Sequence, residues 1–167
     1  MAIKKLFTAR SKIDSPAVDV FRWHEEPGAL ERLTPPWEPV EIEQRPPGIR
    51  DGDRGILRIR LGPFKIRWVL EHRDYIEGRQ FRDVQISGPF RAWQHTHSFT
   101  PDGPQASMLE DRIEYTLPMG FLGALFGNWF VRRKLRRLFE YRHRVTREAM
   151  HAPGIAPREE FTAQNRQ

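Results

Sequence analysis

The period of the hydrophobic pattern changes once along this chain, after Pro118, and the change separates a strand-forming part from a helix-forming part. Between residues 3 and 116, apolar side chains tend to occupy every second position, which indicates strands. Between residues 122 and 149 they recur every three or four positions, which indicates one amphipathic helix about 40 Å long. A single sheet must bury its apolar face, and this helix is the cover that the chain offers. We therefore expect an α+β protein whose curved antiparallel sheet wraps around a long C-terminal helix.

The segments before this helix set the order of the elements. Residues 3–13 alternate as a half-buried first strand. Two short helices should follow, the first after Ser15-Pro16 and the second over residues 29–33. Turn signals such as Gly88-Pro89 divide residues 38–116 into about six further strands, which makes about seven in the sheet. In the long helix, the stripe through Leu135, Leu138, Arg142 and Val145 is expected to face the sheet.

The chain of 167 residues is long enough for one domain with a sizeable core, which we expect over residues 1–151. Residues 152–167 are polar, contain prolines and a glycine, and have no period, so we expect a disordered tail there. The sequence has no cysteine, which excludes disulfides and thiolate metal sites, and its start lacks the apolar segment of a signal peptide. These observations favour a cytoplasmic protein.

An unusual strand occupies residues 91–99, where every second residue is large and either aromatic or basic. Trp93, His95, His97 and Phe99 share one face, because side chains alternate along a strand. Val or Ile would be more usual on a strand that only builds a core. Indoles and imidazoles side by side are more typical of a ligand pocket, in which apolar walls surround a few placed polar groups.

The position of Asp83 depends on how this strand pairs with the strand before it. In one register Asp83 lies beside Trp93 and His95, and in the other it faces solvent while Val84 and Ile86 point inward, because a slip by one residue reverses every face. Burial of apolar side chains favours the second register.

The remaining inward candidates fall into an aromatic and a polar set. Side chains expected to point inward among the aromatics are Phe7, Trp23, Trp37, Trp68, Phe81, Trp93, Phe99, Tyr115 and Phe126. The polar candidates are His72, Asp83, Gln85, His95, His97 and Asp111. A buried polar side chain without a hydrogen bond costs about 1–3 kcal/mol, so these groups must satisfy one another, a water or a ligand. A structural network, recognition of a ligand head group, and catalysis or metal binding all remain open.

Two histidines two positions apart on one face of a strand could form part of a metal site. His95 and His97 could chelate an ion with His72 or Asp83 as a third ligand. Such a spacing arises often by chance, however, and no thiolate accompanies it. We therefore expect no metal and no cofactor.

The order of elements and five segments resemble a known family. The segments are VFRWHEEPGALERLTPPWEPV (20–40), LGPFKIRWVLEH (61–72), FRDVQISGPFRAWQHTHSF (81–99), LEDRIEYTLPMGFLG (109–123) and LFEYRHRVT (138–146). Together they resemble the START-like, or SRPBCC, superfamily, and within it the bacterial polyketide cyclase/dehydrase or coenzyme-Q-binding START group. The resemblance implies a helix-grip fold with a deep hydrophobic cavity for lipids, quinones or polyketides. The family pattern carries Asp83 and Gln85, which favours the register with Asp83 inside.

The basic part of the long helix gives a further expectation. Residues 132–147 contain eight Lys or Arg and one Glu, so the net charge of +6 is concentrated there. A solvated charged face is the ordinary interpretation of such a run. Trp129 followed by Arg132, Arg133 and Lys134 also resembles a segment that could contact an anionic membrane. No motif for reading or stacking bases accompanies the charge, so nucleic-acid binding is not expected.

Two functions follow from the sequence. The first is a non-catalytic carrier or sensor that binds a hydrophobic small molecule through Phe7, Trp68, His72, Phe81, Asp83, Gln85, Trp93, His95, His97, Phe99, Asp111 and Tyr115. The second is a cyclase or dehydratase in which the pair Asp83–His95 acts as a general acid and base. No complete catalytic triad can be identified, which favours the carrier.

Overall fold

The computed structural model describes residues 3–61, 63–118 and 121–151, although not the side chains of residues 61 and 121–126. The expected tail over residues 152–167 lies outside the described residues. Along the chain, the elements are β1 (Lys4–Ile13), α1 (Ala17–Glu25), α2 (Ala29–Arg32), β2 (Val40–Gln44), β3 (Arg54–Leu61), β4 (Phe64–Ile76), β5 (Gln80–Ser87), β6 (Ala92–Pro101), β7 (Ser107–Thr116) and α3 (Phe121–His151).

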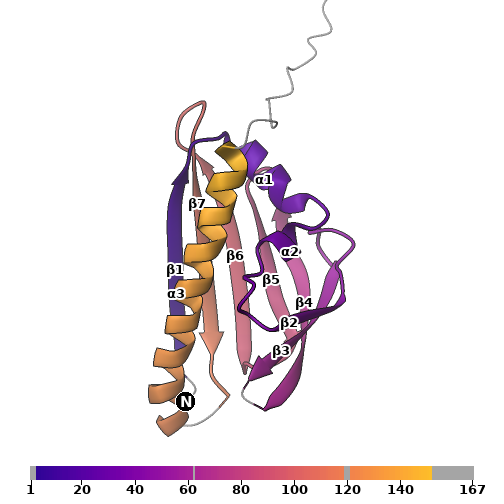
Figure 1. Ribbon diagram of the computed structural model, residues 1–167, viewed down its shortest axis with the longest axis vertical. Coiled ribbons are helices and arrows are strands. Elements are labelled where there is room, and N and C mark those ends of the chain that lie inside the picture. The colour runs from indigo at the N-terminus through magenta and orange to yellow at the C-terminus, as the bar shows by residue number, and fades with distance from the viewer. Residues whose placement is uncertain (1–2, 62, 119–120, 152–167) are drawn as a thin grey trace, which may run out of the picture.

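The strands form one curved antiparallel sheet in the order β1-β7-β6-β5-β4-β3-β2, so the first strand pairs with the last. Figure 1 shows α3 running along one face of the sheet, over β1 and β7, while α1 and α2 lie near one end. The helix-grip fold and the order of elements expected from the sequence are confirmed. None of the helices in the described part of the chain is both long and apolar enough to cross a membrane.

Burial alternates along the strands as the sequence predicts. On β6, Trp93, His95, His97 and Phe99 are buried, and Gln94 between them is exposed. On β1, Phe7 and Ile13 are buried, and both lie on the face that was expected to point inward. One face of the sheet therefore carries the core, and β6 brings its imidazoles into that core.

The register between β5 and β6 is the one that places Asp83 inside. Asp83 pairs with His95 on β6 and with His72 on β4, and His97 pairs with Asp111 on β7. Four neighbouring strands thus bring imidazoles and carboxylates to the same level of the sheet. Ile86 is 45% exposed as a consequence.

The buried face of α3 differs from the expected stripe. Leu135, Phe139, His143 and Thr146 are buried, whereas Leu138, Arg142 and Val145 are only half-buried at the edge. The helix is rotated so that an imidazole, and not the Arg142 guanidinium, faces the sheet. This imidazole, of His143, hydrogen-bonds Asp111, and this contact selects the rotation of the helix that apolar spacing alone leaves open.

The core consists of two apolar clusters with a polar layer between them. The cluster under α1 includes Phe21, Phe81 and Phe99. The cluster under α3 includes Trp93 and Phe139. Between the two clusters lie six ionisable side chains, which we call the polar belt: His72, Asp83, His95, His97, Asp111 and His143.

Trp37 does not point inward as expected. It is 39% exposed and packs at the surface against Tyr141, and the Arg137 guanidinium lies 4.6 Å from its ring centroid. Tyr141 and Arg137 of α3 thus hold the indole of Trp37 at the surface. The side chain of Phe126 lies outside the described residues.

Candidate functional site

Asp111 on β7 is the centre of the polar belt, because three imidazoles contact its carboxylate. Oδ1 accepts a hydrogen bond from His95 Nε2 at 2.7 Å and lies 2.8 Å from His97 Nδ1. Oδ2 accepts a hydrogen bond from His143 Nε2 at 2.7 Å. Burial alone would raise the pKa of Asp111, but the positive charge of His97 and the hydrogen bonds from the imidazoles hold it well below its usual range.

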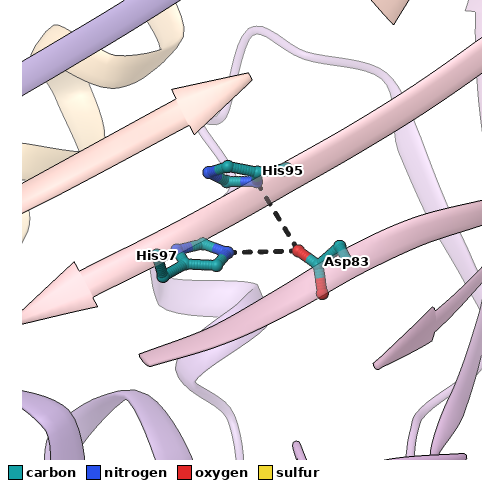
Figure 2. Close-up of side chains that lie close together, drawn as sticks. All are labelled: Asp83, His95 and His97. Carbon is teal, nitrogen blue, oxygen red and sulfur yellow. Dashed lines mark hydrogen bonds and ion pairs between the residues drawn. The ribbon is translucent and has the colours of Figure 1, made fainter. Parts of the chain in front are cut away.

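Asp83 on β5 is the second carboxylate of the belt. Its Oδ1 lies 3.0 Å from His72 Nε2, and its Oδ2 lies 3.1 Å from His97 Nε2 and 3.5 Å from His95 Nδ1. Figure 2 shows both β6 imidazoles turned toward this oxygen. Burial raises the pKa of Asp83, but its imidazole partners outweigh burial and lower the pKa well below its usual range. Asp83 is the more exposed of the two carboxylates, with 19% of its side chain accessible compared with 5% for Asp111.

His97 lies between the two carboxylates, which gives it the character of an imidazolium. Burial lowers the pKa of His97, but Asp111 and Asp83 together raise it to about 9. On β4, burial likewise lowers the pKa of His72, and Asp83 raises it above its ordinary value. The two negative charges of the belt are therefore balanced largely within the belt itself.

His24 on α1 is a buried imidazole outside the belt. Its Nδ1 donates a hydrogen bond to the carbonyl of Val20 at 2.7 Å, and its ring packs edge-on against Phe99 with 5.0 Å between centroids. Burial lowers the pKa of His24 to about 4, because the Val20 carbonyl only partly compensates for lost hydration. His24 is therefore neutral at physiological pH.

The candidate aromatic residues divide between the two apolar clusters. Phe7, Trp93 and Tyr115 belong to the cluster under α3, whereas Phe81 and Phe99 belong to the cluster under α1. Tyr115 donates a hydrogen bond from its hydroxyl to Asn128 Oδ1 at 2.8 Å and so links β7 to the beginning of α3. Their part in ligand binding stays a prediction.

Trp68 on β4 has an unusual environment. Its ring lies 5.1 Å from that of Trp93 and 5.8 Å from that of Phe90, measured between centroids. Its Nε1 is buried and has no hydrogen-bond partner within the described part of the chain. Four residues along the same strand, His72 Nδ1 is also buried and also has no hydrogen-bond partner among the described residues. Two buried nitrogens on one face of β4 thus lack a partner, which is rare enough in folded proteins to call for an explanation.

Gln85 does not join the polar belt. Its side-chain amide donates to the carbonyl of Phe90 at 2.7 Å and accepts a hydrogen bond from the Phe90 amide at 3.3 Å. The side chain braces the connection between β5 and β6 and holds Phe90 over Trp68. Its contribution to a site is therefore to position Phe90.

His143, His24 and Phe90 were not among the candidates chosen from the sequence. His143 continues the spacing of Leu135 and Phe139 by four residues, a signal that could have identified it. No local pattern distinguishes His24 from the polar side of its short helix. Phe90 follows the turn signal, where an exposed loop residue is the ordinary expectation.

Two of the hollows on the described surface lie away from the polar belt. One, of about 190 Å³, lies between β2, β3 and β4 and is lined by residues such as Val40 and Arg58. The other, of about 220 Å³, is lined by outward side chains of β5, β6 and β7, including Arg82 and Thr96. Between the sheet and α3, aromatic side chains of the second apolar cluster occupy the level next to the belt. These two hollows are not the expected cavity between sheet and helix.

The residues expected to contact a membrane differ in how many contacts they make within the protein. Trp129 is 65% exposed, and the Arg133 guanidinium lies 5.9 Å from its ring centroid. Arg132 donates a hydrogen bond to the carbonyl of Leu6 at 3.1 Å, and Lys134 forms an ion pair with Glu38 at 3.0 Å. Arg133 thus remains the most available of the three cations.

Comparison with known families gives one match. The family described as polyketide cyclase / dehydrase and lipid transport matches residues 13–140. No curated protein matches the chain.

Solved structures with a similar fold include three of different kinds. A START superfamily protein from Mycobacterium smegmatis is 12% identical, with 87% of this chain and 96% of that chain covered and a TM-score of 0.63. Norcoclaurine synthase from Thalictrum flavum, in complex with dopamine and hydroxybenzaldehyde, is 15% identical, with 90% of each chain covered and a TM-score of 0.65. The Zhui aromatase/cyclase from Streptomyces sp. R1128 is 15% identical, with 89% and 92% covered and a TM-score of 0.58. At these identities the likeness shows the fold alone.

Proposed function

Because the chain belongs to the polyketide cyclase / dehydrase and lipid transport family of the START-like superfamily, we propose that it binds a hydrophobic small molecule between its sheet and α3. The candidate ligands are a lipid, a quinone or a polyketide-like compound. The observation that carries this proposal is the buried Trp68 Nε1, which has no acceptor among the described residues.

The unpartnered nitrogens of β4 support a ligand with a polar end. A buried donor without an acceptor costs about 1–3 kcal/mol, and a carbonyl or hydroxyl oxygen of a ligand would recover this free energy. His72 Nδ1 lies on the same face of β4 and offers a second polar contact. The rings of Trp93 and Phe90 beside Trp68 supply apolar walls for the remainder of such a ligand.

Phe90 is the side chain that we propose to move when a ligand enters. It is half-buried, belongs to the connection between β5 and β6, and covers Trp68 and Trp93 with centroid distances of 5.8 and 4.7 Å. Loops rearrange more easily than strands, because fewer contacts hold them. Rotation of Phe90 would uncover both indoles without breaking the sheet.

The experiment is a ligand titration of the purified protein. Native mass spectrometry and organic extraction test for a co-purified lipid or quinone, and decylubiquinone then serves as a probe that quenches tryptophan fluorescence. We expect saturable binding that Trp68→Phe weakens roughly tenfold, because the variant keeps a ring and loses one hydrogen bond. Trp37→Phe, at the surface, is the matched control and should bind normally. Equal binding by both variants would contradict the role of Trp68.

The second candidate function is that of an enzyme, and the contact between Asp83 and His95 favours it. In this role the imidazole of His95 would remove a proton from an acidic carbon, as an aldol cyclisation requires, and the carboxylate of Asp83 would orient the ring and balance the charge that it gains. Exchange of the acidic protons of acetylacetone with deuterated water, followed by NMR, measures this ability directly. Exchange that Asp83→Asn reduces would favour the enzyme, and exchange at the rate of buffer alone would favour the carrier.

We also propose that the beginning of α3 contacts anionic lipid when the protein loads or delivers its ligand in the cytoplasm. Exposed Trp129 and Phe130 precede the basic run, and Arg132 at the start of this run donates a hydrogen bond to the carbonyl of Leu6, whose side chain is also exposed. Such a combination of aromatic and cationic side chains suits the interface of a membrane.

A further inference from the structure

We propose that Asp83, His95 and His97 bind a divalent transition-metal ion, with Zn²⁺ as the first candidate. Each residue offers one ligand atom, and these atoms all lie within 4.8 Å of one another. Figure 2 shows the two imidazoles of β6 converging on the carboxylate of β5. The sequence led to the expectation of no metal, because the His95–His97 spacing is common by chance and no thiolate accompanies it; the proposed site does not depend on the hydrophobic ligand.

The two distances between the Asp83 carboxylate and the imidazole nitrogens are close to those around a tetrahedral ion. Ligands about 2.0–2.2 Å from such an ion lie roughly 3.3–3.6 Å from one another. His97 Nε2 and His95 Nδ1 lie 3.1 and 3.5 Å from Asp83 Oδ2. The second of these distances is long for a hydrogen bond, although it is suitable for two atoms that share an ion.

Asp111 supplies the outer partner that metal-binding imidazoles usually have. It accepts a hydrogen bond from His95 Nε2 at 2.7 Å and lies 2.8 Å from His97 Nδ1. A carboxylate only accepts hydrogen bonds, so both of these nitrogens carry hydrogen. The opposite nitrogen of each ring faces Asp83 and is the one that would ligate an ion, with His97 releasing its second proton to solvent when the ion binds. His143 contacts Asp111 through Nε2 and Ser11 through Nδ1, so Ser11 orients the imidazole that holds Asp111 in place.

The contact between His95 and Asp83 is the longest in the polar belt. His97 Nε2 lies 3.1 Å from Asp83 Oδ2, within hydrogen-bond distance, whereas His95 Nδ1 lies 3.5 Å from the same oxygen. A divalent ion would replace both contacts, because it attracts the carboxylate and the two nitrogens together.

The surroundings favour a rigid site with one open position. The ring of Phe81 stacks on His97 at 4.1 Å, and Phe139 lies edge-on to His95 at 5.2 Å. These apolar rings exclude water from two sides of the site and fix the imidazole rotamers. Three protein ligands leave a fourth position for water or for an oxygen of a bound molecule.

The test uses the full chain freed of metal by dialysis against a chelator. We expect it to bind one equivalent of Zn²⁺ in a competition titration with a chromophoric chelator. Co²⁺ should bind with the visible absorption of a four-coordinate ion. Nitrogen-15 NMR of the wild-type imidazoles should show that Zn²⁺ shifts His95 Nδ1 and His97 Nε2 and leaves His24 unchanged. This readout needs no variant, and an absence of stoichiometric binding, or shifts confined to other histidines, would overturn the proposal.

Variants locate the ion independently. Asp111→Asn removes the outer charge and should weaken Zn²⁺ binding about 10–100-fold, and His95→Gln should weaken it further because it removes a ligand. His24→Gln, which changes a buried imidazole outside the site, should bind Zn²⁺ as the wild type does. Circular dichroism checks that each variant is folded. Unchanged affinity in folded His95→Gln would place the ion elsewhere and overturn the proposal, whatever the outcome of the decylubiquinone titration.

Discussion

His143 on α3 donates a hydrogen bond from Nε2 to Asp111 Oδ2 on β7 at 2.7 Å, and so connects the long helix to the sheet through a buried contact with a carboxylate. The second ring nitrogen of His143 lies 2.8 Å from Ser11 Oγ on β1, so the imidazole contacts two strands at once. Side chains that are buried and ionic hold their positions more strictly than apolar ones, because each depends on one particular partner.

Removal of this imidazole should destabilise the protein strongly. In His143→Ala, Asp111 loses one of its buried partners, and loss of one member of a buried pair costs about 3–5 kcal/mol. Urea unfolding followed by circular dichroism measures the free energy of unfolding. His151→Ala, at an exposed position of the same helix, is the control and should change it by less than about 0.5 kcal/mol. Similar losses in both variants would show that the contact with Asp111 is not the cause.

The stability of the protein should fall between pH 6.5 and pH 4 because of His24. Its pKa is about 4 in the folded protein and 6.5 in the unfolded chain, so the unfolded chain takes up the proton first as the pH falls. The contribution of neutral His24 is complete above pH 6.5 and is lost progressively down to pH 4, which amounts to about 3 kcal/mol at 1.36 kcal/mol per pKa unit.

Urea midpoints of the wild type and His24→Gln, measured from pH 4 to pH 7 with a chelator present, test this dependence. The variant should have the flatter profile, because it carries no titrating group at this position. Asp83 and Asp111 add a slope only near the acid end, where the carboxyls of the unfolded chain begin to take up protons, and this slope is common to the wild type and the variant. Parallel profiles would mean that another group causes the slope.

Substitution of Gly88 should disturb Trp68 directly. A Cβ at this position would collide with the Trp68 indole and would lie 2.7 Å from Gln85 Oε1. We expect Gly88→Ala to destabilise the protein by about 1–3 kcal/mol, the usual cost of overpacking, and to shift its tryptophan fluorescence. Ser87→Ala, one residue earlier and exposed, should do neither. A normal spectrum for Gly88→Ala would contradict the close approach of the turn to the indole.

Charge reversal at the beginning of α3 should prevent contact with anionic lipid. We expect the wild type to sediment with phosphatidylserine-containing vesicles at low salt, and Arg133→Glu to lose most of this binding, because each cation near the surface contributes about 1 kcal/mol. Arg10→Glu, on the outer side of β1, is the matched control for net charge. Equal sedimentation of both variants would mean that general charge attraction, and not the segment around Trp129, is responsible.

The sequence was sufficient to predict the sheet and the inward face of β6. Alternation is a local property, so Trp93, His95 and His97 could be assigned to one face without knowledge of their partners. The inward position of Asp83 was predicted from the family pattern and not from burial, because apolar burial argued for Val84 and Ile86. The structure explains the outcome, since three imidazoles contact the Asp83 carboxylate and Ile86 stays partly exposed instead.

The rotation of α3 could not be predicted in the same way. A helical stripe that includes Leu135 and Leu138 is apolar in either orientation, and the deciding contact of His143 is with Asp111, which lies 32 residues earlier in the sequence. The role of Gln85 was missed for a related reason. Its partners are backbone groups of Phe90, and their positions depend on the shape of the turn.

The contact between His143 and Asp111 also fixes how far α3 can slide along the sheet. A helix held only by apolar side chains can shift by one turn, about 5.4 Å, and find new neighbours of similar size. Such a shift in this protein would remove the imidazole from Asp111 and bring Phe139 or Arg147 to its level. The contact with the polar belt therefore allows α3 only one position along its own axis relative to the sheet.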